Sequence, residues 1–482
     1  MQGTKNYNRK LSKLAHKSKQ LRTAQQRIRE LTKSRDNWKQ KYKTLKSQHT
    51  SLQKQQSKGS TINSSQVTCI SRMFKADIPK HHSFPTQVIM LCIWIRQQGN
   101  CSLVTCVEVL RIMSMMFHLS LRIPSKNSIH NWEKKLGHYR VHLPPVEQSR
   151  WVVIMDESIS IGAQKLLLIL GVNLPTYSFG GALTFQDVHV LDLSVGTSWN
   201  SELIQKRLRG LQDRGYLLEY GLSDGGKNLV KAFELSGLDW ISDCSHAFGN
   251  MLKRHYQKEA MFEAFMSQSN RFRQQVSISK SAILMPPKQR QKGRFLNLFP
   301  LSDWGYKMLR LLQDNDSELT QEQREKLAWL THYQDFIIEL HHNTSTINRL
   351  SKLLKTQGLG LETHQECQKI LANQKSSTWL QEQVHDYLEE NLSKIGIHSR
   401  LICCSDIIES IFGKYKNQVG KLADPIITDA CLGIANLSQN FQLEEIKNAM
   451  EQTRMVDLIE WKQNNLPENS LKKRKKLLKS AA

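Results

Sequence analysis

The segment LSDGGKNLVKAFELSGLDWISDCSHAF, residues 222–248, contains two short apolar stretches with a helix-forming stretch between them. Asp224 follows the first predicted strand, Asp243 follows the second, and His246 comes three residues later. A carboxylate at the end of a buried strand commonly binds a metal ion or begins a helix. The Asp-Gly-Gly sequence at Asp224 also suits a plain turn, so this segment leaves both interpretations open.

The residues before this segment predict the rest of a sheet. Three stretches rich in β-branched and other apolar residues precede it, separated by turn residues: RWVVIMDESISI (150–161), KLLLILGVNL (165–174) and DVHVLDLSVGT (187–197). An amphipathic helix is expected over 198–215, ending at Gly215. Three strands, helix, strand, helix, strand is the order of a multidomain α/β protein with a ribonuclease H-like mixed sheet.

Three acidic residues fall where such a sheet could assemble a metal site. Asp156 follows the continuous apolar run WVVIM, where an unpaired carboxylate would be costly to bury. Glu409 lies between isoleucines in DIIESIF (406–412), a predicted helix for which Ser405 is a candidate N-cap. Together with Asp224, these hard oxygen ligands suit Mg²⁺, and two such ions can support phosphodiester chemistry.

Charge indicates a polyanionic partner. The 482-residue chain has a formal net charge of +25, which favours nucleic acid over an acidic membrane. Residues 1–58 carry 17 Lys/Arg against two acids, and residues 466–482 carry six against one. Apolar residues recur at heptad positions along 1–58, which predicts a basic coiled-coil helix or, as the alternative, a solvated single helix. No apolar run is long enough to span a bilayer, and the nine scattered cysteines predict reduced core thiols in a cytosolic protein.

Residues 67–145 are predicted to form a small helical domain. A helix with a stripe at Val104, Val107 and Leu110 is followed by Pro124 and a second helix in SKNSIHNWEKKLG (125–137), which Ser125 should cap and Gly137 should end. This pattern suits a helix-turn-helix DNA reader, although helical hairpins occur in many folds. The predicted exposed, DNA-contacting residues of the second helix are Lys126, Asn127, His130, Asn131 and Lys134.

With these residues in place, the chain resembles the DDE transposases of bacterial insertion sequences, which have a ribonuclease H-like catalytic core. Three motifs carry the resemblance in the family's order: VVIMDES (152–158), GLSDGG (221–226) and SDIIESIFGKYK (405–416). In that family the first acid lies on the first strand, the second follows the fourth strand, and the third lies on a later helix. The match covers about residues 150–250 and 400–420, and Ser405 stands where one branch of the family has an arginine.

The resemblance implies that Asp156, Asp224 and Glu409 are catalytic and bind two Mg²⁺ ions, for which Mn²⁺ can substitute. It implies that Asp243 and His246 support the site, whereas the residues alone leave His246 open as a core histidine. Many members have a basic residue seven positions after the third acid. Lys416 matches that position, and it is expected to contact DNA together with Lys414.

The sequence therefore predicts a transposase that binds element ends and catalyses DNA strand cleavage and strand transfer. Its partners would be terminal-repeat and target DNA and further copies of the chain, at the nucleoid in a bacterial cytoplasm. Two alternatives are a transposase-derived DNA-binding regulator without catalysis, which the three intact acids disfavour, and a structure-specific nuclease on the same fold. The predicted parts are a basic helix (1–58), a helix-turn-helix domain (67–145), a catalytic core (150–250 and 401–465), an all-helical insertion (251–400) and a basic tail (466–482).

Overall fold

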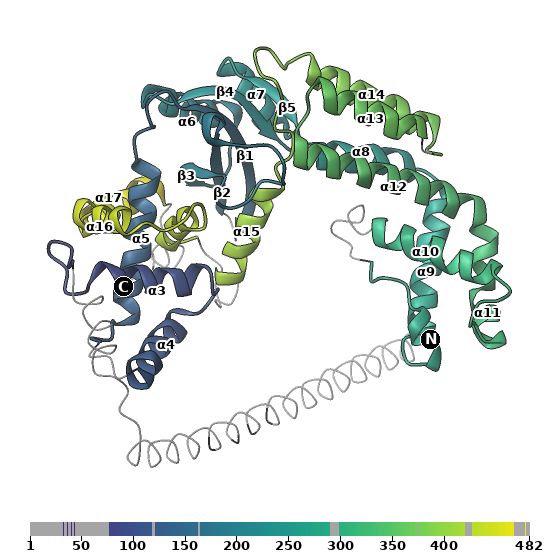
Figure 1. Cartoon of the computed structure of the whole chain (residues 1–482), viewed down its shortest axis with the longest axis horizontal. Helices are drawn as coiled ribbons and strands as arrows, with labels where there is room; N and C mark the ends of the chain where they lie inside the picture. The colour runs from purple at the N-terminus through teal and green to yellow at the C-terminus, as the bar shows by residue number, and fades with distance from the viewer. Residues whose placement is uncertain are drawn as a thin grey trace. The chain divides into compact units, whose positions relative to one another are not determined.

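A computed structural model describes residues 77–117, 121–161, 164–289, 298–373, 375–419 and 427–466, with single residues at 32, 36, 40, 43 and 478. Residues 77–116 and the described residues from 121 onward belong to one compact unit, whose elements are labelled in Figure 1. The predicted basic helix and basic tail lie almost entirely outside the described residues.

A five-stranded mixed sheet forms the centre of this unit (Figure 1). The strands lie in the order β3-β2-β1-β4-β5, in which β1 is antiparallel to β2 and parallel to β4. β2 and β3 pair antiparallel, and β4 and β5 pair parallel. The predicted order of three strands, helix, strand, helix, strand is confirmed: β1 (Arg150–Ile161), β2 (Gln164–Asn173), β3 (His189–Gly196), α6 (Ser201–Asp213), β4 (Leu217–Ser223), α7 (Lys227–Leu235) and β5 (Asp239–Ser242).

Both faces of the sheet are covered, which explains why β1 is a continuous apolar run rather than an alternating one. Trp151, Val153 and Met155 pack on one side with buried residues of α6 and α7. Val152 and Ile154 point to the other side, where the core continues into the helices that follow β5.

The described residues between β5 and Leu401 are mostly helical, as predicted for 251–400. The chain leaves the sheet through α8, and an isolated antiparallel bridge between Leu359 and Leu401 joins the end of α12 to the segment before α15. The helices in this part are α8 (Cys244–Tyr256), α9 (Ala260–Val276), η2 (Lys280–Leu284), α10 (Leu298–Gln313), α11 (Gln321–Leu327), η3 (Ala328–Tyr333), α12 (Gln334–Gln357), α13 (Leu361–Asn373) and α14 (Thr378–Leu392). After the bridge, α15 (Asp406–Val419) packs against β1.

The first and last described helices share a separate apolar core. Ile129, Trp132 and Leu136 of α5, the stripe predicted to be buried, pack there with residues of α3, α4 and α16. α5 also contacts η4 and α17, so helices from both ends of the described chain surround it. The bounds are α3 (Thr86–Gln97), α4 (Leu103–Met116), α5 (Lys126–His142), η4 (Asp429–Asn436), α16 (Leu443–Gln452) and α17 (Met455–Asn465).

This packing corrects three predictions for the helical domain. α5 begins at the Ser125 cap as predicted, but it runs through Gly137 to His142 instead of ending there. Gly137 lies against the backbone of Leu432 in η4, so the glycine serves a close helix contact rather than a helix end. Lys134 is buried beside Asp429 at 3.2 Å, because η4 covers the face that was predicted to be exposed. Val104 of α4 is exposed, and the buried stripe of that helix is centred on Cys106 and Leu110.

Among the described helices, none combines the length and the apolar character that a bilayer crossing needs.

Candidate active site

The register of β1 and β4 places Asp156 and Asp224 at the same level of the sheet. Ile154 pairs with Leu222 across these parallel strands, and each acid follows its own member of that pair by two residues. Adjacent strands are about 5 Å apart, so the backbone at Asp156, within β1, lies beside the backbone at Asp224, which directly follows the last residue of β4. The sheet therefore places the backbones of these two predicted residues next to each other.

A bulge in β1 follows Asp156, and a turn follows Asp224. In β1 the pairing with β2 is irregular between Asp156 and Ile159, and such bulges redirect side chains near functional sites. Asp224 is exposed, and its Oδ1 accepts a hydrogen bond from the Gly226 N–H at 3.0 Å. The turn interpretation of Asp224 is thus correct as local structure, but the carboxylate does not cap α7, for which Gly226 is the N-cap.

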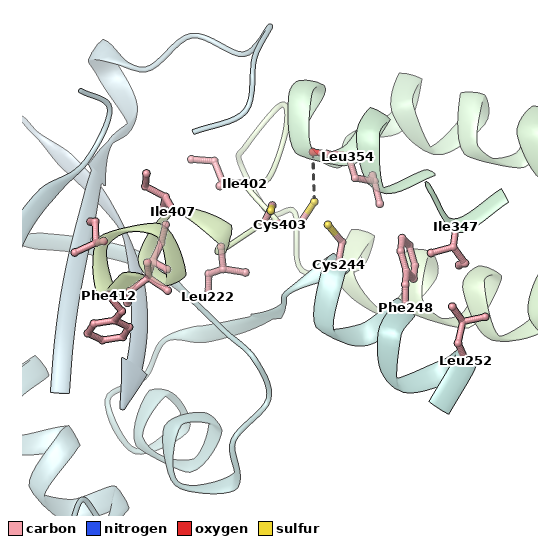
Figure 2. Close-up of a cluster of buried hydrophobic side chains, with 14 of the residues drawn as sticks. Leu222, Cys244, Phe248, Leu252, Ile347, Leu354, Ile402, Cys403, Ile407 and Phe412 are labelled. Carbon is pink, nitrogen blue, oxygen red and sulfur yellow. Dashed lines mark hydrogen bonds between the residues drawn. The ribbon is translucent and has the colours of Figure 1, made fainter. Parts of the chain in front are cut away.

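α15 carries Glu409 to the sheet face that holds Ile154. Ile407 and Phe412 of α15 lie in the same buried cluster as Leu222 (Figure 2), and Ile154 belongs to that cluster as well. Glu409 lies on the same helix, and its side chain is 52% exposed. Asp156 follows Ile154 by two residues and so projects from that face of the sheet. Asp156 and the helix that carries Glu409 therefore lie on the same side of the sheet, while Asp224 lies in the turn after β4.

Asp243 fixes the start of α15 against the end of β5. Its buried carboxylate begins α8 by accepting from the His246 N–H at 2.7 Å. The other oxygen accepts from the Ser405 N–H at 2.5 Å and from the Ser405 hydroxyl at 2.9 Å. The Ser405 hydroxyl, predicted to cap the helix, thus donates to Asp243. Burial alone would raise the pKa of Asp243, but the hydrogen bonds from His246 and Ser405 outweigh it and lower that pKa.

His246 connects Asp243 to Glu409. Its Nδ1 lies 3.0 Å from Asp243 and its Nε2 lies 3.3 Å from Glu409. Hydrogen bonds to Asp243 and then to Glu409 raise the pKa of His246 to about 11, so the ring is a cation at neutral pH. The two residues predicted to support the site form a pair, and His246 is a link between carboxylates rather than a plain core histidine.

Three thiols surround this connection. Cys244, the first residue of α8, lies beside Cys403 (Figure 2) and beside Cys404, and its N–H donates to the Cys403 carbonyl at 2.8 Å. Hydrogen bonds between the thiols, together with burial, raise the pKa values of Cys244 and Cys404, so both stay protonated. The eight cysteines in the described part of the chain form no disulfide, and all but Cys101 are buried.

Sequence reasoning missed two potential metal-binding groups. Within the described ranges, the potential ligand atoms of Asp243, Cys404 and Asp406 all lie within 4.8 Å of one another, and so do those of His364, His385 and Glu389. Asp156, Asp224 and Glu409 are described residues, but their ligand atoms do not all lie within that distance of one another. Asp406 also pairs with Lys355 of α12 at 2.5 Å. Neither group is contained in one short segment, because Asp243 is distant in sequence from Cys404 and Asp406, and His364 lies on a different helix from His385 and Glu389.

The predicted DNA-contacting residues differ in exposure. Lys126 and Asn127 are exposed in the first turn of α5, and His130 and Asn131 are half-buried. Because helices surround the rest of α5, its first turn is the part that could approach a DNA groove. Lys134 is buried beside Asp429 and so cannot contact DNA. On α15, Lys416 is exposed, whereas Lys414 is half-buried over the Phe185 ring at 3.8 Å.

No protein-family model matches the sequence, and no curated protein matches it. Among solved structures, the chain is similar to a Drosophila P element transposase strand transfer complex, with 13% sequence identity and a TM-score of 0.40. The alignment covers 79% of this chain and 94% of that one. A likeness at this level does not establish a shared fold, so the geometry of Asp156, Asp224 and Glu409 has to carry the functional inference.

Proposed function

We propose that this chain is a DDE transposase, which cuts DNA at element ends and joins the released ends to target DNA. One observation supports the proposal: the β1–β4 register sets the backbone at Asp156 beside that at Asp224, and α15, which carries Glu409, packs against β1. The net charge of +25 supports DNA as the partner.

The donor chemistry of these residues fits divalent magnesium. All three offer carboxylate oxygens, the hard ligands that Mg²⁺ prefers, and two of the three side chains are exposed at the sheet edge. Two bound Mg²⁺ ions, or Mn²⁺ in their place, would activate the attacking oxygen and stabilise the leaving oxygen at a phosphodiester. Within the protein, β1 and β4 position the two aspartates, and His246 orients Glu409 while Asp243 holds the ring in place.

The proposed reaction has two chemically similar steps. In the first, a water oxygen attacks a phosphodiester at the element end, and the 3′-oxygen leaves as a hydroxyl. In the second, this 3′-hydroxyl attacks a phosphodiester of target DNA, so one ester bond forms as another breaks. We further propose that the chain acts as a dimer or higher oligomer on DNA, at the nucleoid of a bacterial cell.

The test compares variants in which a carboxylate becomes an amide of the same shape. Asp156→Asn, Asp224→Asn and Glu409→Gln are incubated with Mg²⁺ or Mn²⁺ and the DNA that flanks the chain's own gene, and cleaved and joined strands are separated on a denaturing gel. Each variant should lose both products while it still binds DNA. Glu157→Gln is the matched control, because Glu157 neighbours Asp156 but pairs with Lys165 at 3.4 Å.

The products also separate the alternative functions. Cleaved strands without joined strands would indicate a structure-specific nuclease. DNA binding without either product would indicate a regulator. Wild-type cleavage by any one of the three amide variants would remove that residue from the proposed site.

A further inference from the structure

A second cluster of metal-binding side chains lies on the helical hairpin of α13 and α14, outside the proposed active site (Figure 1). His364 comes from α13, and His385 and Glu389 come from α14. His385 and Glu389 are four residues apart and therefore occupy the same helix face. Their potential ligand atoms and that of His364 all lie within 4.8 Å of one another.

The Gln368 side chain lies between the two imidazole rings of this cluster. Nε2 of His364 lies 2.8 Å from the Glu389 carboxylate, to which it can donate a proton. The Gln368 amide nitrogen lies 2.9 Å from Nδ1 of His385 and 3.5 Å from Nε2 of His364, so nitrogens of both rings face the position that this amide occupies. A cation that displaced the Gln368 amide would be bound by both rings and the carboxylate.

We propose that His364, His385 and Glu389 bind one Zn²⁺ ion that joins α13 to α14. Two imidazoles with one carboxylate are a ligand set that Zn²⁺ takes in proteins, whereas Mg²⁺ takes oxygen ligands. Ligand atoms about 2 Å from one ion lie within about 4 Å of each other, so small side-chain rotations bring this cluster to that spacing. Water would complete a tetrahedral site at the exposed side of the hairpin.

The site would strengthen a helix that supports the sheet. On α14, the Tyr387 hydroxyl donates to the Ser242 carbonyl at 2.8 Å, and Asn391 Oδ1 accepts from the Ser242 N–H at 3.0 Å. Ser242 is the last residue of β5 and precedes Asp243. A metal ion that holds α13 to α14 would therefore stabilise the helix on which the end of β5 rests. This inference does not depend on the proposed function.

The experiment measures Zn²⁺ binding to the full-length, chelator-treated chain by calorimetry, in excess Mg²⁺ so that oxygen-only sites are occupied. The variants are His385→Ala and Glu389→Gln, and the matched control is His332→Ala, which removes an exposed histidine of the same helical part. The wild type and the control should bind one Zn²⁺ and gain thermal stability from it. His385→Ala should bind at least about tenfold more weakly, and Glu389→Gln should bind less tightly than the control.

A visible absorption spectrum of the Co²⁺-substituted protein identifies the ligands even if a variant is less stable than the wild type. Co²⁺ in place of Zn²⁺ gives a visible spectrum that depends on its ligands, and nitrogen and oxygen ligands produce no sulphur-to-metal charge-transfer band. A spectrum with that band, unchanged in His385→Ala, would place the ion at Cys404 and overturn the proposal. Failure of the metal-free wild type to bind Zn²⁺, or equal binding by His385→Ala and the control, would overturn it as well.

Discussion

At the scale of single residues, Asp243 does more than cap a helix, because it also joins the start of α8 to the residue before α15. Its oxygens bind the first turn of α8 on one side and Ser405 on the other, and the carboxylate is fully buried. Asp243→Ala would leave the charged His246 and the Ser405 N–H without this partner. We expect a loss of about 3–5 kcal/mol in the free energy of unfolding, measured by urea denaturation. Asp239→Ala, at the exposed start of β5, should change it by no more than about 0.5 kcal/mol.

His246 predicts a defined pH dependence of stability. Its pKa is raised from 6.5 to about 11 in the folded chain, chiefly by the hydrogen bond to Asp243 and next by that to Glu409. A raised pKa means that the folded state holds the proton more tightly, so the stabilisation is complete below pH 6.5 and disappears as the pH rises towards 11. The difference in unfolding free energy between the wild type and His246→Gln should therefore be largest near pH 6.5 and shrink steadily above it. A difference that stays constant across this range would mean that the ring is neutral in the folded chain.

The sequence allowed part of this residue network to be predicted. The pairing of Asp243 with His246 follows from local geometry, because a helix N-cap lies beside the third residue of its helix. The sequence did not allow us to predict the roles of Ser405, Cys404 and Asp406. Those roles depend on contacts between segments about 160 residues apart. The burial of Lys134 was unforeseen for the same reason, because its cover comes from η4.

At the scale of elements, Gly137 of α5 and Gly249 of α8 should respond in opposite ways to an added methyl group, because their surroundings differ. An added Cβ at Gly137 would overlap the Leu432 carbonyl, whereas at Gly249 of α8 it would meet open space. Gly137→Ala should therefore push η4 away and cost about 1–3 kcal/mol of unfolding free energy. Gly249→Ala should instead gain about 0.5–1 kcal/mol from helix propensity. Thermal melts of the two variants check both signs, and a stabilising Gly137→Ala would contradict the close contact.

The elements themselves were largely predictable, and the exceptions have physical causes. The five strands and the helices between them follow from apolar runs and turn residues, which are local signals. The end of α5 was predicted wrongly because Gly137 looked like a helix terminator, while its real constraint is the approach of η4. The helix-turn-helix interpretation of α4 and α5 failed to anticipate that helices from the other end of the chain cover α5.

At the scale of the whole molecule, most of the net positive charge lies in residues 1–58, of which the structure describes only four single positions. This segment carries +15 of the formal net charge of +25. Deleting it should weaken DNA binding and flatten the dependence of affinity on salt, because fewer counterions are released from the phosphates. Binding of one duplex over a series of salt concentrations gives the slope for each protein. An unchanged slope would assign residues 1–58 to contacts between protein chains alone.

The positions of the three acids around the sheet were only partly predictable from the sequence. Their order along the chain was visible, but their placement depends on the β1–β4 register and on the packing of α15 against β1. A shift of β4 by one residue would have turned Asp224 away from Asp156. That register is set by buried side chains on both faces of the sheet, which no short motif contains.

The contact between Asp243 and Ser405 has a consequence for the order in which the molecule can fold. These residues are 162 positions apart, and the helices from α8 to α14 lie between them. A contact of such long range forms late, because closing the intervening chain into a loop costs conformational entropy before the contact can contribute any stabilisation. During synthesis, the sheet and its two aspartates leave the ribosome well before Glu409 does. The proposed DNA cleavage should therefore begin only after the helical part has folded and α15 has packed against β1.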